Sequence, residues 1–278
     1  MSFKIAVDSC CDLTAEMLRE DCFIKVPLTI FAGGSTFVDD DTFDQADLLF
    51  AMRQSEEAPS TACPSPQAYL EAYRQTDGDV YVVTLSALLS GSHNSAEQAK
   101  RILLEEEPER NVHVFNSCSA ASGEVLVALK IQELADAGLP FDQVVRETEQ
   151  FIYRMETLFV LETLENLRKN GRLTKLQAVV TGALKIKLFM GATPEGEICK
   201  LGQALSVRQA LGKLVDRAAA DPEHEGRTVA ICHCNCPERA MQVKKMINEK
   251  CKFAKTLILE AGGITTVYAN DGGIVVAY

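Results

Sequence analysis

The sequence predicts an α/β fold: a three-layer domain with a parallel sheet, followed by a second α/β domain with a mixed sheet. In the first half, short apolar runs rich in β-branched residues alternate with helical segments, which is typical of a parallel sheet covered on both faces. The second half carries a hairpin signal, Pro194-Glu195-Gly196, between two apolar stretches. We therefore place the domains at residues 1–155 and 156–278, and we find no internal repeat.

The elements of the first half follow from local signals. Thr14 is placed to cap a helix, Pro27 should put its strand at an edge or a bulge, and Pro66 suits the first position of a helix. Strands are expected at residues 3–7, 23–31, 80–83 and 112–115. Helices are expected at residues 14–20, 44–53, from 66 onward, 94–106, 121–137 and 140–155, with a loop at 56–65.

The second half mixes hairpins with strand–helix units, which suggests a sheet with helices on one side. Strands are expected at residues 158–161, 185–192, 197–204, 228–232 and 256–259, and helices at 164–168, 206–220 and 238–250. Residues 170–174 resemble a helix end followed by a new helix start. Residues 265–269 and 274–278 close the chain around the turn at 270–273.

Composition excludes several classes of function. The 28 basic and 39 acidic residues give a net charge of −11, which disfavours nucleic acid and anionic membranes as main partners. No apolar run approaches the roughly 20 residues that cross a bilayer, and the N-terminus lacks a signal-peptide pattern. We expect a cytoplasmic monomer that touches membranes only transiently, with its ten cysteines as reduced thiols.

The stretch at residues 80–100 has the sequence pattern of an anion-binding site. A buried strand leads into a loop of serines and Gly91, and a helix follows, so unpaired N–H groups and the helix dipole meet there. Loops after the first and fourth predicted strands, beginning at Asp8 and Asn116, should gather at the same sheet edge. Serine and glycine are also the ordinary residues of such loops, so this pattern alone leaves both readings open.

Several motifs along the chain fit one pattern. They are, in order, Asp8-Ser9 with Asp12-Leu13, Thr61-Ala62-Cys63-Pro64-Ser65, Leu89-Ser90-Gly91-Ser92-His93-Asn94-Ser95-Ala96, Asn116-Ser117 with Ser122-Gly123, Leu167-Arg168-Lys169-Asn170-Gly171-Arg172-Leu173, and the glycine-rich turn at 270–273. Their order and spacing resemble the DegV family of bacterial fatty-acid-binding proteins, over essentially the whole chain.

The resemblance implies a DegV-like pair of α/β domains with a long-chain fatty acid buried between them. It implies no catalysis, no metal and no cofactor other than the acid as ligand. Thr61 and Ser90 would hydrogen-bond the carboxylate, Gly91 would offer a loop N–H, Arg172 would lie near the head group and Asn270 could donate its amide. Family members that serve a fatty acid kinase present the acyl carboxylate to it for phospholipid metabolism.

Two residues depart from the family pattern. Asn270 stands where the family commonly has the histidine of a His-x-Gly-Pro-Gly motif, so we expect weaker pH dependence of binding. Leu205 stands where the family often has an arginine linked to kinase docking, and the nearest arginine is Arg208. The first departure affects the hydrogen bonds to the head group of the acid, and the second affects docking to a fatty acid kinase.

The physical demands on such a site are simple. Burying an acyl chain gains about 0.8 kcal/mol per methylene, so specificity must come from donors to the carboxylate. We expect residues 176–190 and 158–161 to line the tunnel, although each could equally be ordinary core.

Two other functions remain open. A serine-dependent esterase would use Ser90 with His93 or His233, but no Gly-x-Ser-x-Gly elbow surrounds Ser90. A protein that binds a phosphate compound would suit the same loop, but the sequence has no P-loop. Cys232-His233-Cys234-Asn235-Cys236 lacks the paired spacing of a zinc site and is read as a strand end.

Overall fold

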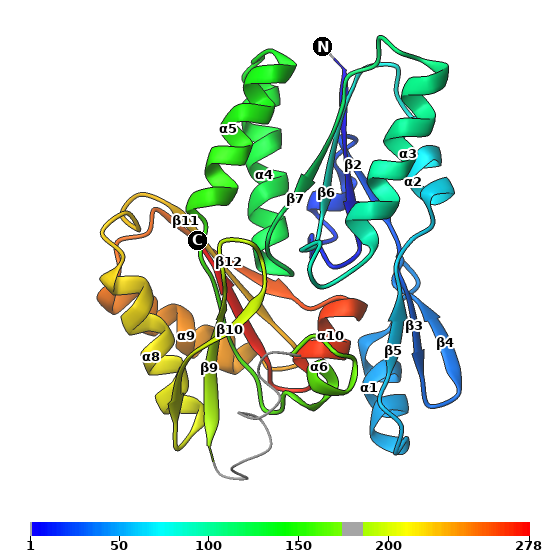
Figure 1. The fold of residues 1–278 in the computed structure, drawn as a ribbon. Helices are drawn as coiled ribbons and strands as arrows, with labels where there is room; N and C mark the ends of the chain where they lie inside the picture. The colour runs from blue at the N-terminus through cyan, green and yellow to red at the C-terminus, as the bar shows by residue number, and fades with distance from the viewer. Residues whose placement is uncertain (1, 174–185) are drawn as a thin grey trace.

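A computed structural model of the chain describes residues 2–173 and 186–278. Its described strands form three sheets, in the orders β2-β1-β6-β7, β10-β9-β8-β13-β11-β12 and β4-β3-β5 (Figure 1). The predicted α/β class, with one parallel sheet and one mixed sheet, is confirmed.

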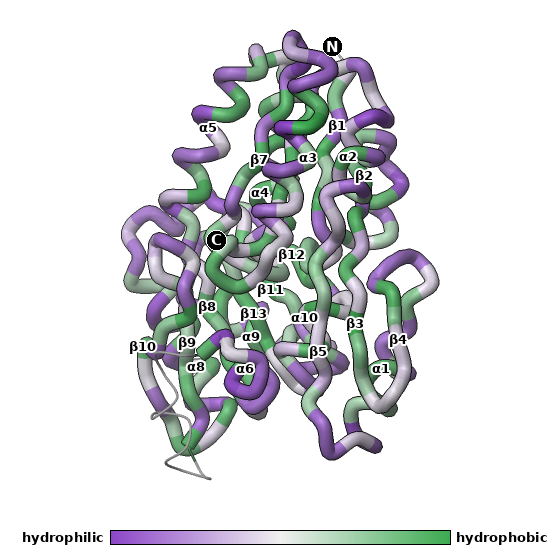
Figure 2. The backbone as a smooth tube through the Cα atoms, turned by 45° about the vertical axis from the view of Figure 1, so that its right-hand side comes forward, coloured by the Kyte–Doolittle hydropathy of each residue, from purple (hydrophilic) through white to green (hydrophobic). Residues whose placement is uncertain are grey.

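The first sheet is parallel throughout and has helices on both faces. Its strands are β1 (Phe3–Asp8), β2 (Phe23–Val26), β6 (Asp79–Thr84) and β7 (Val112–Asn116). Ile5 and Val7 pack toward helices α4 (Ser122–Asp136) and α5 (Phe141–Arg154), whereas Ala6 packs toward α2 (Pro66–Tyr73) and α3 (Ser92–Glu106). This alternation follows from the two-residue period of a strand, and it gives the sheet an apolar cluster on each face. Figure 2 shows the hydropathy of the residues along the backbone.

The predicted single strand at residues 23–31 is wrong. Pro27 lacks the N–H that a ladder needs, and the chain leaves the parallel sheet there and enters a separate three-stranded sheet. That sheet contains β3 (Thr29–Ala32), β4 (Ser35–Val38) and β5 (Ser60–Ala62), and α1 (Gln45–Gln54) packs beside it. The predicted helix at 14–20 is also reduced, to the 3-10 turn η1 (Met17–Arg19), whose Met17 N–H donates to Thr14 Oγ1 at 3.2 Å.

The second large sheet is mixed. Its strands are β8 (Thr157–Val160), β9 (Lys187–Ala192), β10 (Ile198–Ala204), β11 (Thr228–His233), β12 (Lys255–Glu260) and β13 (Ile274–Ala277). The predicted hairpin is the antiparallel pair β9–β10, while β11 and β12 are parallel. Helices α8 (Val207–Ala220) and α9 (Pro237–Lys250) cover one face, as the hydrophobic cluster around Leu158 and Ile231 shows.

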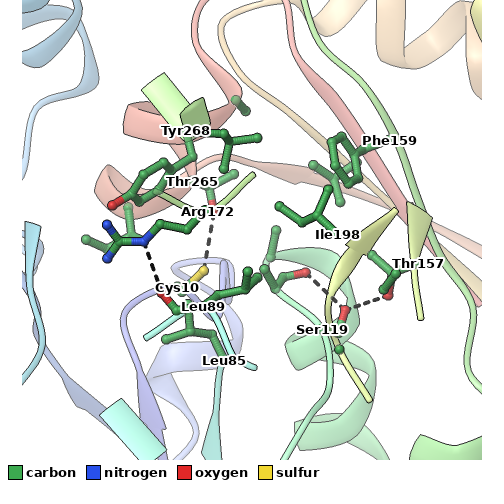
Figure 3. A pocket seen from close by; sticks show the side chains of 18 of the residues that line it. Cys10, Leu85, Leu89, Ser119, Thr157, Phe159, Arg172, Ile198, Thr265 and Tyr268 are labelled. Atoms are coloured by element: carbon green, nitrogen blue, oxygen red, sulfur yellow. Dashed lines mark hydrogen bonds between the residues drawn. The ribbon is translucent and has the colours of Figure 1, made fainter. Parts of the chain in front are cut away.

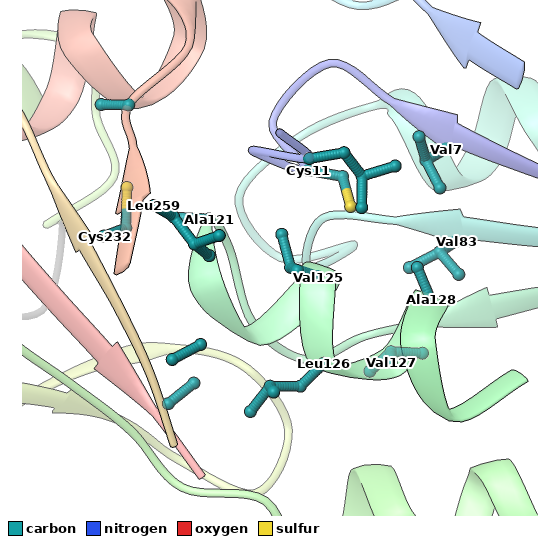
Figure 4. Packing of buried hydrophobic residues seen from close by; sticks show 14 of the residues in the cluster. Val7, Cys11, Val83, Ala121, Val125, Leu126, Val127, Ala128, Cys232 and Leu259 are labelled. Carbon is teal, nitrogen blue, oxygen red and sulfur yellow. The ribbon is translucent and has the colours of Figure 1, made fainter. Parts of the chain in front are cut away.

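The opposite face of this sheet packs against the first half of the chain. Val125 of α4 and Ala121, the residue just before α4, lie between the two large sheets and share one core with Cys232 and Leu259 (Figure 4). Two short helices, α6 (Glu165–Lys169) and α10 (Gly263–Ala269), lie between the mixed sheet and the small sheet (Figure 1). The boundary that we place at residue 155 falls between α5 and β8.

Candidate functional site

A cavity lies between the loops of the parallel sheet and the face of the mixed sheet that is opposite α8 and α9. Its empty space amounts to about 750 Å³, a figure that includes the open solvent at its mouth. The wall is almost wholly apolar, and its larger side chains are Leu85, Leu89, Phe159, Leu161, Ile198 and Val275. Arg172, Thr265 and Tyr268 stand together at one side (Figure 3), so the cavity suits a long apolar ligand with one polar end.

The buried carboxylate of Asp8 ties together the loops that form the cavity floor. It accepts hydrogen bonds from the Leu85 N–H at 3.0 Å, the Cys10 N–H at 3.1 Å and the Ser92 hydroxyl at 2.7 Å. The Ser86 N–H donates to the carbonyl of Ser119 at 2.8 Å, which brings in the loop after β7. The loops after β1, β6 and β7 therefore meet at one sheet edge, as predicted.

A second carboxyl group, Glu124, is fully buried in the same region, next to Asp8 and Cys10. Burial, reinforced by the neighbouring Asp8, raises the pKa of Glu124 well above its usual range. Burial also raises the pKa of Asp8, against the lowering effect of its hydrogen bonds, so this region holds two carboxyl groups whose charged forms are both disfavoured by burial.

Arg172 is the cation at the cavity. Its Nε donates to the Leu89 carbonyl at 3.1 Å and its Nη1 to the Asn170 carbonyl at 2.6 Å, which fixes the guanidinium. The Cζ atom lies 5.6 Å from the centroid of the Tyr268 ring. Within residues 2–173 and 186–278, no carboxylate forms an ion pair with Arg172, so its charge is available to an anionic ligand.

Thr61 contacts this end of the cavity indirectly, by a hydrogen bond to Tyr268. The Thr61 hydroxyl and the Tyr268 phenol are 2.8 Å apart, and Tyr268, rather than Thr61, lines the cavity. Our sequence reasoning missed Tyr268 and Thr265. Their spacing of three residues in a helix places both on one face, but the sequence does not show what that face meets.

Ser90 and Gly91 lie at the mouth, outside the apolar wall. Both line a shallow hollow that shares Leu89 and Arg172 with the cavity, and Ser90 Oγ accepts a hydrogen bond from the Ser92 N–H at 3.2 Å. Asn270 does not belong to the described lining. It ends α10 with a φ of 56°, and its Oδ1 accepts from the Asp271 N–H at 2.8 Å.

Two carboxylates from the first half hold the N-terminus of α10. Asp39 accepts from the N–H groups of Gly263 at 2.8 Å and Ile264 at 2.9 Å. Asp12 accepts from the Gly262 N–H and the Thr265 hydroxyl, each at 2.8 Å. Burial raises the pKa of Asp12 to about 7, against the lowering effect of these hydrogen bonds.

The other candidate residues have structural partners. His93 Nδ1 lies 3.2 Å from Thr84 Oγ1, and Ser90 makes no hydrogen bond to a histidine in the described part of the chain. The thiols of Cys232 and Cys234 donate to Asp12 and Thr266. Among the described residues, no cluster of three or more His, Cys, Asp or Glu side chains has metal-site geometry.

The predicted tunnel walls are only partly described. Phe159 and Leu161 line the cavity, while Leu158 faces the other side of the sheet. Of the stretch 176–190, residues 176–185 lie outside the described residues, and the described lining takes up again at Gly191. None of the described helices has the length and hydropathy to cross a membrane.

Comparison with known proteins gives consistent matches over the full length. Residues 2–278 match a family model described as "Uncharacterised protein, DegV family". A DegV domain-containing protein from Streptococcus pyogenes serotype M18 is 36% identical over 280 residues, which cover 100% of this chain and 99% of that protein.

Two solved structures are similar at the level of the whole fold. A DegV family protein from Ruminococcus gnavus, described with vaccenic acid, has 45% identity and a TM-score of 0.96, with 100% of both chains covered. The Fatty Acid Kinase (Fak) B3 protein from Streptococcus pneumoniae, described as loaded with linoleic acid, has 33% identity and a TM-score of 0.91, with 100% of this chain and 99% of that chain covered.

Proposed function

This chain belongs to the DegV family, and from that premise we propose that it binds one long-chain fatty acid between its two halves. The observation that carries the proposal is the apolar cavity with Arg172 at its polar end, a cation that has no ion-pair partner among the described residues. Methylenes in such a cavity gain about 0.8 kcal/mol each, while a buried carboxylate needs a cation and donors. Solved relatives described with vaccenic and linoleic acid support the same ligand class.

In this proposal the carboxylate lies at the Arg172 end. Thr61 contributes through its hydrogen bond to Tyr268, and Ser90 and Gly91 face the head group from the mouth. Asn270 would act on the site by ending α10. The protein then works as a carrier without catalysis or cofactor, in the cytoplasm and as a monomer.

A kinase partner forms part of the proposal. The similar Streptococcus pneumoniae protein is described as Fatty Acid Kinase B3, which supports presentation of the acid to a kinase of that kind. Leu205 follows β10 and is 78% exposed, so it offers such a partner an apolar contact in place of a charge.

The test is to identify what the purified protein carries. Native mass spectrometry, followed by lipid extraction, should find one long-chain fatty acid per chain. Ile198→Trp should abolish the bound mass because it fills the cavity, and Ile102→Trp on the exposed side of α3 should leave it unchanged. Delipidated wild-type protein that fails to bind oleate would overturn the proposal.

A further inference from the structure

Helix α10 carries a polar group into the cavity at a position that our sequence reasoning did not consider. Tyr268 lines the cavity and is half-buried, and its phenol lies 2.8 Å from the Thr61 hydroxyl on β5. Thr61 and Tyr268 are 207 residues apart in the sequence, and their hydroxyl groups meet at the polar end of the cavity. The phenol is therefore held in place from outside the cavity.

The same ring also orients the cation. Arg172 lies over Tyr268 and donates through Nε to the Leu89 carbonyl (Figure 3). Its Nη1 donates to the Asn170 carbonyl. Within the described residues its Nη2 makes no hydrogen bond, so Nη2 is the guanidinium nitrogen that the described contacts leave for a ligand. A phenol and a guanidinium side by side offer an uncharged donor and a charged one, which suits the two oxygens of a carboxylate.

The end of α10 provides no competing side chain. Asn270 uses its amide oxygen on the next residue's N–H and is not among the residues that line the described cavity. Thr265, on the same face of the helix as Tyr268, already donates its hydroxyl to Asp12. Tyr268 is thus the uncharged donor that α10 can offer to the ligand.

We propose that Tyr268 is a head-group ligand that donates its phenol O–H to the carboxylate of the bound acid, with Thr61 as the residue that positions it. The inference rests on the proposed function and adds a selectivity to it. Either hydroxyl can donate in the Thr61–Tyr268 hydrogen bond, and in this proposal Thr61 donates to the phenol oxygen, which leaves the phenol hydrogen for the carboxylate. The site then distinguishes a fatty acid from an uncharged lipid with the same tail, because a hydrogen bond to a charged acceptor is stronger.

The experiment compares oleate with oleyl alcohol by titration calorimetry. Tyr268→Phe should weaken oleate binding about tenfold or more and change oleyl alcohol binding less than about threefold. The matched control Tyr153→Phe, at an 82% exposed position, should change neither. Thr61→Val should weaken oleate binding less than Tyr268→Phe, and should add nothing in the Tyr268→Phe background, because it acts through the phenol.

The outcomes separate the two proposals. Wild-type protein that binds neither probe overturns the fatty-acid function itself. Wild-type protein that binds oleate, with Tyr268→Phe binding it equally well, overturns the role of Tyr268 alone. Equal losses for oleate and oleyl alcohol also overturn it, because a purely structural defect would not depend on the head group. Circular dichroism melting of each variant confirms that the titrated protein is folded.

Discussion

The carboxylate of Asp12 accepts a hydrogen bond from the hydroxyl of Thr265 at 2.8 Å, across 253 residues of sequence. This contact joins the loop after β1 to the helix that lines the polar end of the cavity. Asp12 also accepts hydrogen bonds from the Gly262 N–H and the Cys232 thiol. A single carboxylate therefore links the loop after β1 to β11 and α10.

Asp12 should make stability depend on pH in an unusual direction. Because burial raises its pKa from 3.8 to about 7, the folded protein keeps a proton that the unfolded chain loses. The contribution to stability is therefore full below about pH 4 and falls as pH rises to about 7. Relative to Asp12→Asn, the wild type should lose free energy of unfolding between pH 5 and pH 8 in guanidinium titrations. Parallel pH profiles for the two proteins would contradict this.

Asp39→Ala should destabilise the protein by about 1–3 kcal/mol. The variant leaves the N–H groups of Gly263 and Ile264 without their acceptor and leaves Lys25, 3.7 Å from Asp39, without its ion-pair partner. Chemical denaturation measures the loss, and Asp41→Ala, at an exposed position nearby, serves as the control. Equal free energies of unfolding for the two variants would show that Asp39 does not hold α10.

Gly196→Ala should be much more damaging than Gly226→Ala. Both glycines have positive φ, 87° and 79°, so both substitutions carry a backbone cost of about 1–2 kcal/mol. A Cβ at Gly196 would also lie 2.4 Å from Ser86 Oγ and 2.7 Å from Cys118 Cα, whereas nothing lies within 4 Å at Gly226. We expect an additional loss of about 1–3 kcal/mol for Gly196→Ala, measured by thermal and chemical unfolding. Similar losses would mean that the β9–β10 turn does not pack tightly on the first half.

Arg172→Ala should weaken oleate binding at least about tenfold, because the carboxylate loses its cation. Arg172→Lys should recover part of the affinity, since it keeps the charge but loses the contacts to the Leu89 and Asn170 carbonyls. Arg146→Ala, on the exposed side of α5, is the control for loss of one positive charge. Unchanged affinity in Arg172→Ala would place the carboxylate elsewhere.

Binding should depend on pH less than in a relative that has histidine at the position of Asn270. The described cavity lining contains no histidine, which is the side chain that ordinarily changes charge near neutral pH. Asp12 titrates in that range, so the comparison is made in the Asp12→Asn background. Equal slopes of affinity against pH for the two proteins would reject the expectation.

Much of the fold could be predicted because its signals are local. The strands of the parallel sheet are apolar and β-branched, and helices such as α2 and α8 begin at Ser65 and Ser206, whose side chains accept from the N–H groups of the first turn. The small sheet was missed because β4 and β5 are short, and because β5 pairs with β3 across a long separation in sequence, with Thr29 opposite Ala62.

The candidate site was less accessible to sequence reasoning. Arg172 and Thr61 were named from the family resemblance, and the structure shows that their surroundings depend on Tyr268. The sequence around Tyr268 says that it can lie on a helix face with Thr265, but not that this face meets β5 and the loop after β6. Those contacts form only when the two halves of the chain pack together.

The order of strands in the mixed sheet has a consequence for synthesis of the protein. Among the strands of that sheet, β13 is synthesised last, yet it lies in the interior of the sheet between β8 and β11. The nascent chain therefore cannot close the sheet in steps as it emerges, and the groups on β8 and β11 that bond to β13 wait for the final strand. Chaperones that shield unpaired strand edges during translation would therefore act longest on this half of the molecule.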